Sequence, residues 1–170
     1  MKVIKTNLPK VSLLSNHPRD YEDGYSATLA NKDLTIEQVT KSFITSAPVW
    51  ANWLVTVRNW VVSIFGLKTS GASDAEWEAS LKNFKCEVGN QIGLFKVFDK
   101  NEHEIILGEN DKHLDFRVSL FLDRTNNTLT VSTIVKFHNW LGRLYFLPVK
   151  PFHKLIVPTM VKEMGSSLVQ

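Results

Sequence analysis

Residues 113–138 read HLDFRVSLFLDRTNNTLTVSTIVKFH, and the pattern of this segment indicates the class of fold. Apolar and polar residues alternate over 113–122 and again over 129–138, which is the period of two that β-strands follow. Between the two runs, Asn126-Asn127 tolerates the positive φ of a tight turn. The segment therefore predicts a β-hairpin with one nearly continuous apolar face and one polar face.

Closing the hairpin on this pair of asparagines also predicts its register. Leu122 then lies opposite Val131 on the apolar face, and Asp115 lies opposite His138 on the polar face. Because helices cover the apolar face of such a sheet, we expect the polar face to meet solvent.

Other segments extend the sheet. QIGLFKVF (91–98) and HEIILG (103–108) flank DKNE and predict a second hairpin, while DYEDGYSATLA (20–30) predicts a strand nearer the N-terminus. The residues before it contain prolines and scattered polar groups, and they predict an irregular lead-in over 1–19.

Helices are indicated by caps and by a period near 3.6. Thr35 and Gln38 have the spacing of a capping box, which predicts a helix start. Pro48 ends that helix and begins a second one over 48–66, where Trp, Leu and Val recur at steps of three and four.

Two segments complete the chain. Residues 68–80 are polar and contain Gly and Ser, so they predict a loop. Residues 148–165 predict a long amphipathic C-terminal helix.

This order of elements predicts an α+β fold. A curved antiparallel sheet wraps around the long C-terminal helix, and two shorter helices follow the first strand, which is the helix-grip arrangement. We expect one domain of this kind over 20–170, preceded by the lead-in.

Composition narrows the partners. The net charge of +3 is mild and no run of Lys and Arg stands out, so no nucleic-acid partner is predicted. No stretch has the ~18 uninterrupted apolar residues of a spanning helix, so we expect no integral membrane association and a cytoplasmic location. The single Cys86 excludes an internal disulfide framework. No phosphate-binding loop is present, so no cofactor is predicted.

Four blocks carry a resemblance to a known family: DYEDGYS, SAPVWANWLVTVRNWVVSIFGL, LGENDKHLDFRVSL and TIVKFHNWLGRLYFLPVKPFHKLIVP. Together they resemble an uncharacterised bacterial domain-of-unknown-function family that we place in the START-like (polyketide-cyclase and lipid-transfer) superfamily. The resemblance covers roughly residues 20 to 165. It implies a helix-grip fold with an internal cavity, and it brings no activity, substrate or catalytic residue.

Polar residues crowd the segment GENDKHLDFRVS (108–119), which raises the question of a metal site. Asp111, His113 and Asp115 alternate along a strand, so the two carboxylates would lie about 13 Å apart at Cα. Metal ligands must converge within about 2 to 2.6 Å of one ion. No metal is therefore predicted, and GEND is interpreted as a turn.

The neighbouring pair Asp115 and His138 has two interpretations. The first is a catalytic pair in which the carboxylate orients the imidazole for general acid/base chemistry. The second, which we favour, is a cross-strand ion pair on the solvated face.

We favour a binding protein for a small apolar or amphipathic molecule, held in a cavity between the sheet and the C-terminal helix. The candidate ligand-binding residues are Arg58, Tyr25, Tyr145 and His153. The alternative is a cyclase, dehydratase or isomerase that uses the Asp115–His138 pair on a hydrophobic substrate. A second alternative is an interaction module with a filled core, and the sequence leaves the oligomeric state open.

Overall fold

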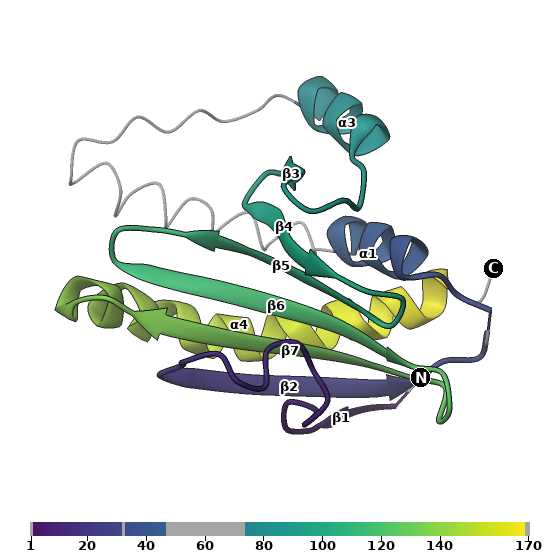
Figure 1. Ribbon diagram of the computed structural model, residues 1–170, viewed down its shortest axis with the longest axis horizontal. Helices are drawn as coiled ribbons and strands as arrows, with labels where there is room; N and C mark the ends of the chain where they lie inside the picture. The colour runs from purple at the N-terminus through teal and green to yellow at the C-terminus, as the bar shows by residue number, and fades with distance from the viewer. Residues whose placement is uncertain (1, 32, 47–73, 169–170) are drawn as a thin grey trace.

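The computed structural model describes residues 2–31, 33–46 and 74–168 of the chain (Figure 1). Within them, antiparallel strands form one sheet in the order β1-β2-β7-β6-β5-β4-β3. The strands are β1 (Val3–Lys5), β2 (Tyr21–Thr28), β3 (Gln91–Ile92), β4 (Phe95–Lys100), β5 (Glu104–Asn110), β6 (Leu114–Asp123) and β7 (Thr128–Phe137). The helices are α1 (Ile36–Thr45), α3 (Asp74–Asn83) and α4 (Trp140–Ser167). The predicted α+β class and C-terminal helix are confirmed.

One face of the sheet, here called the helix face, packs against the helices. Figure 1 shows α4 lying across this face, in contact with β1, β2 and β7, while α1 contacts α4, β5 and β6. The core forms where apolar side chains of the strands meet those of the two helices. Its members include Val118, Leu120, Leu129, Val131, Val39, Phe43, Val157 and Met160.

The opposite, outer face is partly covered by the N-terminal segment. Leu14 is completely buried against Ile106 and Ile134. Glu104, only 1% exposed, accepts hydrogen bonds from the hydroxyls of Ser12 and Ser119 and, at 2.7 Å, from the backbone N–H of Leu13. A buried carboxylate is tolerable only with such donors. The predicted irregular lead-in is therefore attached to the sheet, and at Val3–Lys5 the prediction is wrong because these residues pair with β2 as β1.

The β6–β7 hairpin forms as predicted, but its register differs by two residues. Leu122 lies opposite Leu129 and Asp115 lies opposite Lys136, so the predicted pairings with Val131 and His138 are wrong. Since the side-chain period of a strand is two, every side chain nevertheless keeps its predicted face.

The physical reason for the shift is the turn. Carboxylate oxygens of Asp123 accept hydrogen bonds from the backbone N–H groups of Thr125 and Asn126 and from the side-chain amide of Asn126. These bonds stabilise a four-residue loop between the strands. Asn127, with φ of 49°, supplies the one positive φ of this loop.

The first helix follows the predicted capping box. The backbone N–H of Gln38 donates to Oγ1 of Thr35 and the side chain of Gln38 accepts from the Thr35 N–H, so this prediction is confirmed. The second predicted helix, 48–66, lies outside the described residues.

The loop predicted for 68–80 is wrong over 74–80, which belongs to α3. Gly71 and its neighbouring serines suggested a loop, but DAEWEASLKN consists mostly of residues that favour helices. Leu81 of α3 packs against the core. Within the predicted strand 91–98, Gly93 adopts a positive φ of 55° and divides the segment into β3 and β4.

Helix α4 begins at Trp140, eight residues before the predicted start at 148. Asn139 caps it by accepting a hydrogen bond of 3.1 Å from the N–H of Gly142. The helix contains Pro148, Pro151 and Pro158, each of which leaves the carbonyl four residues earlier without its helical donor. Those carbonyls belong to Leu144, Leu147 and Lys154, all exposed, so water can replace the missing donors.

Candidate functional site

Strand β2 places a carboxylate inside the layer between the sheet and α4. Asp23 is 5% exposed, and its Oδ2 accepts a hydrogen bond of 2.6 Å from the hydroxyl of Tyr21. Its Oδ1 lies 3.3 Å from Nε2 of His153 on α4. These three residues, here called the Asp23 cluster, join the sheet to the C-terminal helix.

The electrostatics of the Asp23 cluster keep its phenol neutral. Burial raises the pKa of Tyr21 far above its ordinary value, and the hydrogen bond to Asp23 raises it further. Burial and the charge of Asp23 also raise the pKa of Tyr25, the next residue along β2 on the helix face. Tyr21 therefore acts as a hydrogen-bond donor to Asp23.

A buried hydroxyl adjoins this cluster. Thr133 of β7 lies directly opposite Asp23 in the sheet and is 3% exposed. Within the described residues its Oγ1 has no hydrogen-bond partner. A buried polar atom in this state is uncommon because it forfeits its bonds to water, so the site retains unused hydrogen-bonding capacity.

An open hollow of about 490 Å³ lies beside the Asp23 cluster, where the ends of β2 and β7 meet the first turns of α4. The residues that line it are Asp20, Tyr21, Phe137, Trp140, Arg143, Leu144, Phe146, Leu147 and Lys150. Tyr21 belongs to both the hollow and the cluster, and its ring packs edge-on against Phe146 at a centroid distance of 4.8 Å.

Two cationic side chains in the hollow lie over aromatic rings. Arg143 lies 5.4 Å from the centroid of Phe137, and Nζ of Lys150 lies 5.3 Å from that of Tyr21. Asp20 at the rim accepts a hydrogen bond from the Phe137 N–H and pairs with Lys136 at 3.2 Å, and these contacts lower the pKa of its carboxyl. The hollow thus combines apolar surface with positive charge.

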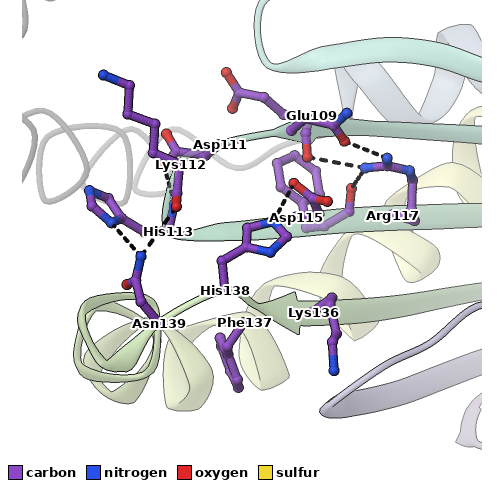
Figure 2. A network of polar contacts seen from close by, with 12 residues as sticks. Glu109, Asp111, Lys112, His113, Asp115, Arg117, Lys136, Phe137, His138 and Asn139 are labelled. Atoms are coloured by element: carbon purple, nitrogen blue, oxygen red, sulfur yellow. Dashed lines mark hydrogen bonds and ion pairs between the residues drawn. The ribbon is translucent and has the colours of Figure 1, made fainter.

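The second polar network lies on the outer face (Figure 2). Nε2 of His138 is 3.0 Å from Oδ1 of Asp115, although the two are not opposite in the register. Their side chains are 41% and 28% exposed. Lys136 points away from this pair and reaches Asp20 instead. The structure therefore brings the predicted pair together, on the face opposite the helices.

Arg117 of the same face is held by other groups. Its guanidinium donates to the carbonyls of Glu109 and Phe116 and to the side chain of Asn110, and it stacks 3.6 Å from the centroid of Phe98. Burial lowers the pKa of Arg117, while the charge of Asp115 opposes that shift. These contacts are those of a side chain that packs on its own sheet.

The turn before β6 anchors the start of α4. The side-chain amide of Asn139 lies 3.2 Å from the Lys112 carbonyl and 3.1 Å from Nδ1 of His113, and the His138 N–H donates to the His113 carbonyl at 2.9 Å (Figure 2). A Cβ at Gly142 would lie 2.1 Å from that same carbonyl oxygen, so only glycine fits there. Lys112 and His113 of this turn thus support the helix. The turn predicted for GEND is wrong over Gly108, Glu109 and Asn110, which belong to β5 and pair with β6.

The predicted ligand-binding residues have different surroundings. Arg58 lies outside the described residues. Tyr25 is 8% exposed within the core, and Tyr145 is partly buried against the cluster of Leu114, Val135 and Phe146. His153 joins the Asp23 cluster.

Sequence reasoning missed Asp23 as the partner of His153, although it had placed Tyr21, Asp23 and Tyr25 on one face of a strand. It also missed the hollow, because its expected helix start at 148 left out Trp140 and Arg143. The signal that was available is Asn139, which has the residue type and spacing of a helix cap before Gly142.

The described residues form neither a metal-binding cluster nor a membrane-spanning helix. Apart from residues 1, 32, 47–73 and 169–170, no group of three His, Cys, Asp or Glu side chains is arranged to hold a metal ion. Over the same part of the chain, no helix combines the length and the hydropathy needed to cross a bilayer.

Comparison with known proteins gives one family. No curated protein and no solved structure matches the chain. The family described as "Protein of unknown function (DUF2867)" matches residues 16–160, which include β2, β4 to β7 and most of α4. The chain therefore belongs to the DUF2867 family of proteins of unknown function.

Proposed function

We propose that the chain binds a small amphipathic molecule with an anionic head in the hollow between the sheet and α4. The observation that carries the proposal is the combination, in one open space of about 490 Å³, of aromatic and leucine side chains with Arg143 and Lys150. Ligand sites in proteins are commonly concave and mostly apolar, with a few polar groups that set the orientation.

The apolar part of the ligand would lie on Phe137, Phe146 and Leu147. Each methylene removed from water contributes about 0.8 kcal/mol, so a chain of a few carbons supplies most of the affinity. Farther along α4, Val161 and Met164 are completely buried against the sheet, which favours the N-terminal half of the helix as the site.

The head would interact with Arg143. Nη2 of Arg143 lies 3.7 Å from Oδ1 of Asp20, a distance longer than a hydrogen bond. The side chain of Arg143 is 66% exposed. A guanidinium presents a fork of donors that suits a carboxylate or phosphate, and Lys150 adds a second positive charge.

The expected helix-grip, START-like architecture supports this location, since such folds hold ligands between the sheet and the C-terminal helix. The curved antiparallel sheet with α4 across it is compatible with that expectation. Tyr25, Tyr145 and His153 do not line the hollow and remain proposed ligand-binding residues for a ligand that extends from it between the sheet and α4. Arg58, outside the described residues, remains one from the sequence alone.

Calorimetric titration with dodecanoate, dodecanol and dodecylamine, each below its micelle concentration, tests the proposal. We expect dodecanoate to bind most tightly and Arg143→Gln to weaken it about tenfold, the loss typical of one charge-assisted contact. Lys154→Gln removes the same charge from an exposed position of α4 outside the hollow and should leave binding unchanged. Equal affinity for the three compounds, or no binding of any, would contradict the proposal.

A proton-transfer enzyme is the second candidate, favoured by the buried carboxylate of Asp23 beside His153. In that candidate Asp23 orients the imidazole through Nε2, and Nδ1 exchanges the proton. The outer pair of Asp115 and His138 is the alternative site for the same chemistry.

Deuterium exchange into 2-decanone, followed by mass spectrometry, separates the two sites. His153→Gln should abolish protein-dependent exchange and His138→Gln should not. The reverse result assigns the chemistry to the outer pair, and no exchange in the unmodified protein removes this candidate.

A further inference from the structure

The solvent side of α4 exposes large apolar side chains. Trp140 is 69% exposed, Leu144 54%, Leu147 66% and Leu155 61%. Their spacing of four, three and eight residues places them on one side of the helix. Pro148 and Pro151, also exposed, lie on the same side. We call these six residues the apolar stripe.

A row of cations runs beside the apolar stripe. Arg143, Lys150 and Lys154 are exposed, at spacings of seven and four residues, and therefore follow one edge of the stripe. In Figure 1 these turns of α4 lie at the end of the sheet away from α1 and α3. The solvent side of this half of α4 thus carries an apolar stripe with a row of positive charges along one edge.

Positive charge is concentrated in the part of the sequence that includes this half of α4. Six of the chain's 20 Lys and Arg residues lie in the segment from Arg124 to Lys162, both ends included, and none of its 17 Asp and Glu residues does. This segment has a formal charge of +6, whereas the rest of the chain, with 14 cations against 17 anions, has −3. The overall +3 conceals this asymmetry along the sequence. Three of the six cations, Arg143, Lys150 and Lys154, follow the stripe, and they favour an anionic surface as the partner of this side of α4.

The chemistry of the stripe favours a lipid surface. Trp, Leu and Lys or Arg on one helix are typical of helices that lie in the plane of a membrane interface, where aromatic and aliphatic side chains enter the headgroup boundary and cations meet anionic lipids. An acidic protein partner would need a surface shaped to fit this helix and the adjoining hollow, whereas a lipid surface is soft and adapts to both.

The prolines limit the depth of such contact. The carbonyls of Leu144, Leu147 and Lys154 have lost their helical donors to Pro148, Pro151 and Pro158 and depend on water. Hydrocarbon offers no donors, but the headgroup region is hydrated. This side of α4 therefore fits shallow contact and not deep insertion.

We propose that the apolar stripe and its row of cations dock the protein on the surface of an anionic phospholipid membrane. The proposal goes beyond ligand binding in the hollow and does not rest on it. The apolar stripe and the hollow adjoin, however, because Trp140, Leu144 and Leu147 belong to both.

Co-sedimentation of the full chain with phospholipid vesicles tests the docking. We expect retention on vesicles with about one-third phosphatidylserine, little on pure phosphatidylcholine, and release by salt. The double variant Lys154→Gln/Leu155→Gln should lower the partition coefficient about tenfold. Neither residue lines the hollow, so dodecanoate binding by this variant should be unchanged.

The matched control is Lys85→Gln/Val88→Gln, which alters an exposed lysine and a valine that is 62% exposed, both away from α4. It should sediment like the unmodified protein. Equal retention of both double variants, or no retention of the unmodified protein, overturns the proposal. Sedimentation velocity without lipid gives a further check. If the unmodified protein self-associates and Lys154→Gln/Leu155→Gln does not, the stripe binds a second copy of the chain and the proposal is also overturned.

Discussion

Asp23 and His153 are 130 residues apart in the sequence, yet Oδ1 of the carboxylate lies 3.3 Å from Nε2 of the imidazole. The contact crosses from β2 to α4 and is buried, with the two side chains 2% and 18% exposed. The other carboxylate–imidazole pair, Asp115 and His138, has a similar distance of 3.0 Å but is 28% and 41% exposed. The two pairs form a natural comparison of one interaction in two environments.

We expect the buried pair to be coupled and the exposed pair nearly uncoupled. A double-mutant cycle of Asp23→Asn and His153→Gln should give a coupling energy of about 2 kcal/mol, because both groups have left water. The same cycle with Asp115→Asn and His138→Gln should give less than about 1 kcal/mol, since water screens that pair. Urea unfolding measures both, and equal coupling energies would contradict the expectation.

Tyr21→Phe should change how stability depends on alkaline pH. The pKa of Tyr21 is raised in the folded protein, whereas an unfolded tyrosine loses its proton near 10.0. The unfolded state therefore releases the proton first, and the free energy of unfolding falls as pH rises above about 10. Because the variant lacks the hydrogen bond to Asp23, its free energy of unfolding at neutral pH should be lower by about 1.5 kcal/mol. Its free energy of unfolding should also fall less steeply as pH rises above about 10. Urea unfolding from about pH 8 to about pH 11 checks this, and parallel curves would argue against it.

Glu104→Ala should release the N-terminal segment from the outer face. It removes the acceptor of Ser12, Leu13 and Ser119, leaves their donors unpaired and should cost about 3 kcal/mol. Limited trypsin digestion after Lys10 should become faster, with Glu102→Ala, an exposed carboxylate in the adjacent turn, as the control. Equal cleavage rates in both variants would mean that Glu104 does not hold the segment.

Gly142→Ala should destabilise the packing of α4 on the sheet more than removal of its N-cap, Asn139, does. The new Cβ would lie 2.1 Å from the carbonyl oxygen of His113, which is backbone and cannot move alone, so we expect a loss of about 3 kcal/mol. Asn139→Ala removes the cap and should cost about 1 kcal/mol. Thermal unfolding followed by circular dichroism ranks the two, and the opposite order would disprove this account of the helix start.

The faces of the strands could be predicted because they depend on a local period of two. Asp115 and Arg117 lie on the outer face, as the alternation of β6 indicates. The register could not be predicted from the asparagines alone, because the side chain of Asp123 stabilises a longer loop. The start of α4 was missed for a similar reason, since the turn at Lys112 and His113 holds Asn139 in place.

The Asp23 cluster illustrates what remained beyond the sequence. The sequence predicts the strand that carries Tyr21 and Asp23 and the helix that carries His153. The contact between them depends on how α4 lies over β2, which no local pattern encodes. The hollow depends on the same placement, together with the eight residues of α4 that precede the predicted start.

The order of the strands has a consequence for self-assembly. The described sheet ends in its two shortest strands, the three residues of β1 and the two of β3, while the ten-residue strands β6 and β7 are paired on both sides. A long unpaired strand is a template on which further chains can polymerise, and short edge strands deny that template. The protein can therefore expose tryptophan and leucine on a helix while its sheet offers little for amyloid-like growth.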